Sequence, residues 1–181
     1  ALAGLDRSNM QKFLDLNDAV GGAPTTRYLK INREADPTSL RYLKFVSDIK
    51  RLLGSKHGSV LEIGGGYGGL YLCASMFLDI GSYLVKDHKS VIPFIEGYLQ
   101  NFNLSLSEDK DTFDTVLSTY AWDELDFEDR EQYLTKYFLS SKKGYLVAND
   151  KKIDQHSWPE DITRIPDQIS PNYSIIYWNR N

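Results

Sequence analysis

The sequence has little cysteine, no long apolar run and no excess of basic residues. Its 181 residues include one cysteine, Cys73, so no internal disulfide can form and a reducing compartment such as the cytoplasm is expected. No apolar run approaches the roughly 20 residues of a membrane span, and no basic and apolar leader opens the chain, so no membrane partner is expected. The formal net charge of −4 gives no general attraction for phosphate backbones, which argues against a nucleic-acid partner.

The remaining composition is that of an ordinary globular protein. Hydrophobic residues make up 41% and charged residues 25% of the chain, enough for one domain with a full core. Helical periodicity is expected in residues 6–20 and 37–53, which end at glycines. We therefore expect residues 1–56 to form an N-terminal helical segment that packs on a core of residues 57–181.

The densest motif of the chain is the stretch S-V-L-E-I-G-G-G-Y-G-G-L, residues 59–70. A short apolar run of strand type leads into five glycines and then into a helix-competent segment. Glycines clear space for a ligand, and the N-terminus of the following helix offers free N–H groups, which favours a nucleotide-like ligand. The residues expected to line such a site are Gly64, Gly65, Gly66, Tyr67 and Gly68.

A carboxylate inside the strand narrows the choice of ligand. Gly64, Gly66 and Gly69 also satisfy the spacing of dinucleotide-binding sites. Glu62, however, would repel a pyrophosphate and attract a cation. The pattern E-x-G-x-G-x-G resembles motif I of class I S-adenosylmethionine (SAM) methyltransferases, whose ligand carries a sulfonium and an amino group.

The rest of the chain reads as alternating strands and helices. Strands are expected at residues 60–63, 82–86, 103–107, 113–118 and 144–148, with helices between them and a last strand at 173–178. Right-handed crossovers would make the first five strands parallel. The predicted fold is a Rossmann-like doubly wound α/β sheet with helices on both faces and an antiparallel last strand, the class I methyltransferase fold.

Asp87 follows the second strand, roughly 20 residues after the glycines, where a carboxylate can accept both hydroxyls of a ribose. The alternative is a charge at the N-terminus of the next helix. His88 would lie near the ribose or adenine.

The segment D-T-V-L-S-T-Y-A-W-D-E-L, residues 114–125, and the later S-K-K-G-Y-L-V-A-N, residues 141–149, resemble the sugar O-methyltransferase family. This resemblance covers residues 60–149 and implies SAM as cofactor, S-adenosylhomocysteine as product and a sugar or glycan as acceptor. The chain departs from the family after Asp87, where His88 and Lys89 replace leucine and proline.

Methylation of an alcohol requires a group that accepts its proton. Asp123 and Glu124 follow the fourth strand on the rim expected to bind ligands, with helix capping as their alternative role, and His156 after the fifth strand is a rival base. Tyr120 is placed with the cofactor. The residues expected to contact the acceptor are Tyr28, Trp122, Asn149 and Trp158.

Four further interpretations stay open. Asp123 and Glu124 with Asn149 and Asp150 imitate the oxygen ligands of magnesium-dependent O-methyltransferases, so Mg²⁺ is considered but not favoured. The chain could also be a methyltransferase for another small molecule, a nicotinamide-dependent oxidoreductase or a non-catalytic SAM-binding domain. The sequence does not indicate an oligomeric state.

Overall fold

The computed structural model describes residues 2, 4–20, 26–28 and 33–180, with the backbone alone for 26–28 and 33. Its helices are α1 (Arg7–Val20), α2 (Pro37–Leu53), α3 (Gly69–Phe77), α4 (Ile92–Gln100), α5 (Phe127–Tyr133) and α6 (Asp150–Ile153). A 3-10 turn, η1 (Ala121–Asp123), precedes α5, and a π-helical turn, η2 (Leu134–Phe138), continues it. No described helix is long and apolar enough to cross a membrane.

Within the described part of the chain, eight strands form two sheets. The small sheet pairs β1 (Thr26–Tyr28) with β2 (Arg33–Ala35) in antiparallel fashion. The large sheet has the order β4-β3-β5-β6-β8-β7. Its strands are β3 (Lys56–Ile63), β4 (Asp79–Lys86), β5 (Thr115–Thr119), β6 (Lys143–Asn149), β7 (Thr163–Pro166) and β8 (Tyr173–Asn179).

The pairing of the large sheet follows the predicted class. β3 pairs in parallel with β4 and β5, and β5 pairs in parallel with β6. β8 is antiparallel to both β6 and β7. The mostly parallel sheet with an antiparallel last strand is therefore confirmed, and the crossovers bring the carboxyl ends of four strands to one rim.

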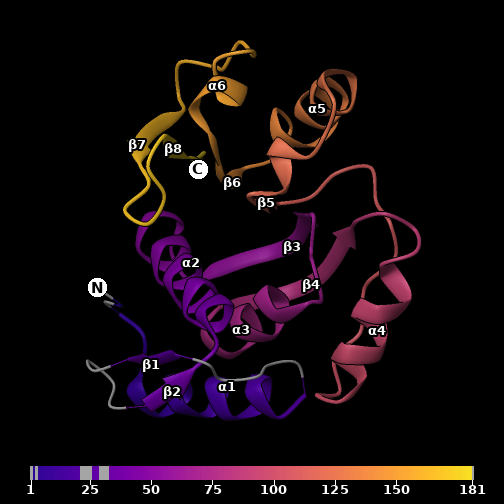
Figure 1. The fold of residues 1–181 in the computed structure, drawn as a ribbon. Coiled ribbons are helices and arrows are strands. Elements are labelled where there is room, and N and C mark those ends of the chain that lie inside the picture. The colour runs from indigo at the N-terminus through magenta and orange to yellow at the C-terminus, as the bar shows by residue number, and fades with distance from the viewer. Residues whose placement is uncertain (1, 3, 21–25, 29–32, 181) are drawn as a thin grey trace.

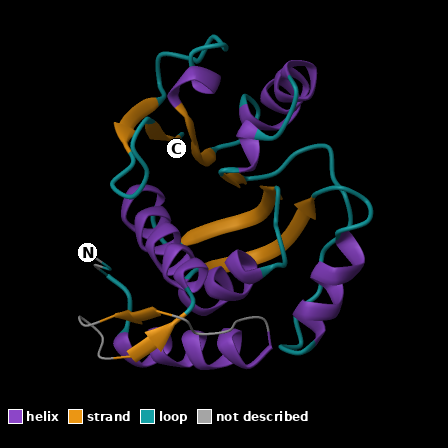
Figure 2. Cartoon of the chain, viewed as in Figure 1, coloured by secondary structure: helices purple, strands orange, loops and turns teal. Residues whose placement is uncertain are grey.

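Helices cover both faces of this sheet because its central strands are apolar on both sides. Along β6, Tyr145 and Val147 pack toward α1, α2, α3 and α4, whereas Leu146 and Ala148 pack toward η2 and α6. Figure 1 shows α1, α2 and α3 together on one side of β3 and β4, with α5 and α6 on the other side. Figure 2, in the same view, distinguishes the helices from the strands by colour.

Local sequence explains where α2 begins and ends. The Asp36 side chain accepts a hydrogen bond from the Thr38 N–H, and Pro37 occupies the first helical position, where its missing N–H is not needed. Gly54, with φ of 85°, ends the helix. The helix thereby presents one face, including Leu43, Val46 and Ile49, to the core.

Two expectations about strands are wrong. Residues 103–107 form no strand: only the Ser107 N–H bonds to the carbonyl of Tyr83 on β4, so four strands rather than five are parallel. β3 begins at Lys56, four residues earlier than expected. His57 therefore lies inside a strand and is 2% exposed.

Candidate functional site

The glycine turn connects β3 to α3 at the rim where the parallel strands end. Gly64 has φ of 77°, and a Cβ placed there would lie 2.0 Å from the Cβ of Ala121 in η1. A larger residue at this position would therefore combine an unfavourable backbone conformation with a steric clash. The turn lets β3 and the loop after β5 approach each other closely.

Asp87 links this turn to the end of β4. Its Oδ2 accepts hydrogen bonds from the N–H groups of Gly65 at 2.9 Å and Gly66 at 3.3 Å, and its Oδ1 accepts one from the His88 N–H at 2.7 Å. The side chain is half-buried, and these three hydrogen bonds hold its carboxylate in place and leave one lone pair, on Oδ1, for a ligand.

A cavity of about 620 Å³, which we call the main hollow, lies over the ends of β3, β4 and β5. This volume lies within the range of small-molecule sites. The structure brings together six of the residues predicted for the site along its walls: Gly64, Gly66, Asp87, His88, Tyr120 and Glu124.

Glu62 lines a smaller cavity of about 160 Å³ together with the glycine turn and α2, and we call this cavity the inner hollow. The side chain is 1% exposed and accepts a hydrogen bond from the Tyr83 hydroxyl at 2.8 Å. Burial, helped by the nearby Asp87 charge and opposed by the Tyr83 hydrogen bond, raises the pKa of Glu62 to about 8. A cationic group in the inner hollow would favour the ionised form.

A third cavity of about 450 Å³, which we call the outer hollow, is lined by Arg41, Tyr120, Asp123, Glu124, Ser170 and Tyr173. Tyr120 lines all three hollows. Its backbone is left-handed, with φ of 67°, which is rare outside glycine and is found at functional sites. Its hydroxyl donates to Asp167 Oδ2 at 3.0 Å, and its ring packs edge-on against Phe45 and Tyr173.

The two acidic residues after β5 differ in their contacts. Asp123 accepts the backbone N–H of Asn149 at 3.0 Å and so ties η1 to the end of β6. The Asn149 side chain in turn accepts the Lys151 N–H at the start of α6. The Glu124 side chain is exposed and makes no hydrogen bond with the described residues, and it lines both the main and the outer hollow. Glu124 is thus the carboxylate available to a ligand.

His156 lies away from these hollows, contrary to its expected place on the rim. Its side chain is buried against Trp122 and Phe127, accepts a hydrogen bond from Arg130 Nε at 3.0 Å through Nε2, and contacts Glu131 through Nδ1. Both ring nitrogens are therefore occupied by protein groups. The position is that of a core residue rather than a base.

The two tryptophans predicted to contact an acceptor occupy the same core. Trp122 is 0% exposed, and its ring lies 6.0 Å from that of Trp158. The Trp158 Nε1–H donates to the carbonyl of Ile153 at 3.0 Å. Neither ring lines a described hollow of the site.

Tyr67 and Gly68 lie on the other side of the glycine turn. The Tyr67 hydroxyl donates to Asn17 on α1 at 3.2 Å, and its ring packs against Tyr98 on α4. Gly68 begins α3. The backbone of Tyr28 lies in β1, and its side chain is outside the described part of the chain.

Sequence reasoning missed Arg41 on α2 and the segment that contains Asp167, Ser170 and Tyr173. A charged residue within a helix that otherwise packs on the core is a weak signal for Arg41. The other segment has no signal of its own, because only the antiparallel pairing of β8 brings it to the rim.

Within the described residues, no group of three or more histidine, cysteine, aspartate or glutamate side chains could hold a metal ion. Asp150 instead pairs with Arg164 at 2.8 Å and accepts from the Ser174 hydroxyl at 2.6 Å. Among the ligands considered for magnesium, Asp123 and Asp150 thus both bind protein groups.

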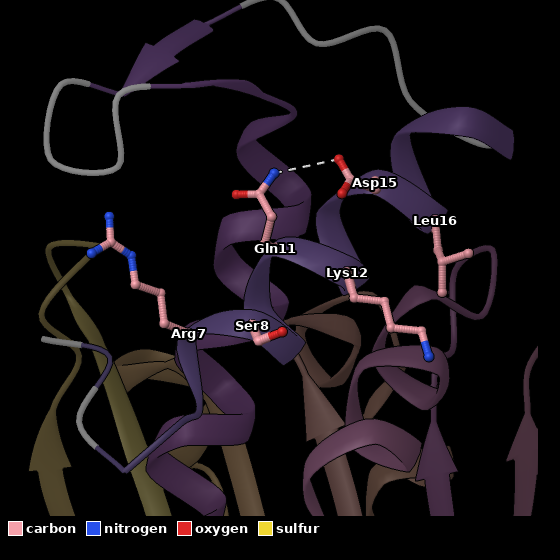
Figure 3. Close-up of a pocket in the computed structure, with 6 residues that line it drawn as sticks. All are labelled: Arg7, Ser8, Gln11, Lys12, Asp15 and Leu16. Carbon is pink, nitrogen blue, oxygen red and sulfur yellow. Dashed lines mark hydrogen bonds between the residues drawn. The ribbon is translucent and has the colours of Figure 1, made fainter.

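A further cavity of about 600 Å³ lies along α1 and shares no lining residue with the three hollows. Figure 3 shows its lining residues on consecutive turns of that one helix, with Gln11 donating to Asp15. A wall made by a single helix offers no convergent groups, so we do not include it in the site.

The sheet order, the antiparallel last strand and the glycine turn define the class I methyltransferase fold. No protein-family model matches the chain, and no curated protein matches its sequence. Solved structures with the same fold match nearly all of it. These similarities, at 15% identity or less in the structures described next, show the fold alone.

Three solved structures illustrate the match. A methyltransferase from Pyrococcus furiosus is 15% identical with a TM-score of 0.58, over 96% of this chain and 100% of that one. A Pyrococcus horikoshii protein provisionally described as an RNA methyltransferase is 14% identical with a TM-score of 0.59, over 96% of each chain. An O-methyltransferase from Bacillus cereus, in complex with S-adenosylhomocysteine, is 13% identical with a TM-score of 0.52, over 97% and 92%.

Proposed function

We propose that this chain is a SAM-dependent O-methyltransferase that acts on a hydroxyl of a sugar or glycan. The observation that carries the proposal is the convergence of Glu62, Asp87 and the glycine turn on adjoining hollows at the carboxyl rim of the sheet. Open α/β sheets bind ligands at that rim. The structural neighbours described as methyltransferases share this fold.

The residues present fit the parts of SAM. The Asp87 carboxylate, fixed by the N–H groups of Gly65, Gly66 and His88, keeps a lone pair on Oδ1 for a ribose hydroxyl. Buried Glu62 suits the cationic methionine end. SAM supplies an activated methyl group when bound, so the protein's main task is to align the acceptor and exclude water.

Glu124 is the residue best suited to receive the acceptor proton. Its carboxylate faces both the main hollow and the outer hollow and is free of hydrogen bonds to the described residues. The rings of Tyr120 and Tyr173 line the outer hollow, where they could pack on the apolar face of a sugar. The choice of a sugar as the acceptor rests on the sequence resemblance in residues 114–149.

Calorimetric titration of the wild-type protein with S-adenosylhomocysteine and, separately, with NAD⁺ tests the cofactor. We expect S-adenosylhomocysteine to bind and NAD⁺ not to bind. Asp87→Ala should weaken S-adenosylhomocysteine binding roughly ten- to hundredfold, because hydrogen bonds to a charged group are lost. Asp111→Ala, which removes an exposed aspartate, should leave binding unchanged. Binding of NAD⁺ alone would indicate an oxidoreductase, and binding of neither ligand would contradict the proposal.

A further inference from the structure

Arg41 brings to the site a positive charge that no acidic side chain of the described residues pairs. It lies on α2, is exposed, and lines both the inner and the outer hollow. Among the described residues its guanidinium donates no hydrogen bond and forms no ion pair; its contact is the ring of Tyr120, 5.9 Å from the centroid. Two other basic residues of α2, Lys44 and Arg51, each form an ion pair with Asp48.

The inner hollow combines this cation with a buried acid. Glu62 accepts one hydrogen bond, from Tyr83, and has no basic partner among the described residues. A cavity of about 160 Å³ admits a small polar group, whereas the main hollow of about 620 Å³ is large enough for a nucleoside. A ligand group that pairs both residues must carry a carboxylate and an ammonium close together.

We propose that Arg41 binds the carboxylate and Glu62 the ammonium of the methionine end of SAM, so that the site selects ligands with an intact α-amino acid. This inference rests on the proposed function. A guanidinium can bind a carboxylate through two parallel hydrogen bonds. Arg41 also lines the outer hollow, where it could instead bind an anionic acceptor. Asp123 and Glu124 line that hollow and would repel an anion, so the inner hollow is the more favourable place for the carboxylate that Arg41 binds.

The test compares three ligands by calorimetry: S-adenosylhomocysteine, its analogue without the carboxylate, and its analogue without the amino group. Each is titrated into the wild-type protein, Arg41→Ala and Arg51→Ala. Arg51→Ala is the matched control, because it removes an arginine of the same helix that does not line the hollows.

We expect Arg41→Ala to weaken binding of both carboxylate-bearing ligands roughly ten- to hundredfold and to leave the decarboxylated analogue unchanged. Arg51→Ala should change none of the three. An equal loss for all three ligands, or no loss for any, would overturn the assignment of Arg41 while leaving SAM binding established. Failure of the wild-type protein to bind S-adenosylhomocysteine would instead overturn the proposed function, and this inference with it.

Discussion

Among the described carboxyl groups, Glu62 is the one whose pKa the fold raises. Burial raises its pKa from 4.5 to about 8, so between these values the folded protein holds a proton that the unfolded chain releases. The free energy of unfolding from this group is therefore fully present below pH 4.5 and falls as the pH rises toward 8. The loss should be on the order of a few kcal/mol.

Denaturant unfolding at a series of pH values between 5 and 9 measures this effect. We expect Glu62→Gln to flatten the decline and to make the protein more stable than the wild type near pH 9. Glu128→Gln, at an exposed position on α5, should leave the decline intact. An unchanged pH dependence in Glu62→Gln would mean that another group is responsible.

Glu124 carries the prediction about chemistry. Because we propose Glu124 as the positioned base, Glu124→Gln should lower turnover by ~10²–10⁴-fold. Affinity for S-adenosylhomocysteine should change little, because glutamine keeps the size of the side chain that lines the main hollow and no hydrogen bond to a described residue is lost. Asp123→Asn is the companion variant, since an amide oxygen can still accept the Asn149 N–H.

The measurement is transfer of a labelled methyl group from SAM to a panel of sugars, nucleotide sugars and RNA oligonucleotides. Label in a sugar hydroxyl that depends on Glu124 is the expected result. Near-normal turnover in Glu124→Gln would remove it as the base, and label found in RNA alone would contradict the sugar acceptor.

For the residues that follow β5, the sequence predicted the positions of only some side chains correctly. Tyr120 and Trp122 both follow β5, and both were expected to face a ligand. The left-handed backbone of Tyr120 redirects the chain into η1, so Tyr120 packs toward the α2 side and Trp122 enters the core of the opposite face. Periodicity does not reveal such a turn, because the left-handed residue is a tyrosine rather than a glycine.

At the scale of elements, the close approach of β3 and η1 through Gly64 gives a stability prediction. Gly64→Ala should destabilise the protein by on the order of 2–4 kcal/mol, because an L-residue is disfavoured at this φ and its Cβ would overlap that of Ala121. Thermal unfolding would detect this loss. Ala121→Gly in the same chain should recover part of it, since the overlap disappears while the backbone cost remains.

Gly97→Ala provides the control for that prediction. Gly97 lies within α4 without a positive φ, and no atom lies within 4 Å of the place that an alanine Cβ would take. Alanine there should therefore raise stability by roughly 0.5–1 kcal/mol. A Gly64→Ala protein as stable as the wild type would show that the turn and η1 are farther apart than described.

Elements with strong local signals were predicted well, and those without were not. The capped helix α2 and the apolar strands β5 and β6 agree with expectation to within a few residues. Residues 103–107 alternate leucine with polar residues as a strand would, yet they make one backbone bond to β4. The strand β7 went unpredicted because it is short and mostly exposed at the sheet edge.

At the scale of the whole molecule, the fold class followed from the order of strands and helices, because right-handed crossovers leave few arrangements. The same rule placed the glycine turn and Asp87 together at one rim of the sheet. It did not reveal the outer hollow, because that cavity depends on Arg41 from α2 and on Ser170 and Tyr173 near β8, which only tertiary packing brings to the rim.

A crystal structure of the protein soaked with S-adenosylhomocysteine tests the central claim most directly. We predict ligand density in the main and inner hollows, with the ribose hydroxyls within hydrogen-bond distance of Asp87 and the amino group near Glu62. Density at another place on the molecule, or none at saturating ligand, would contradict the claim that the glycine turn of this chain serves a SAM site.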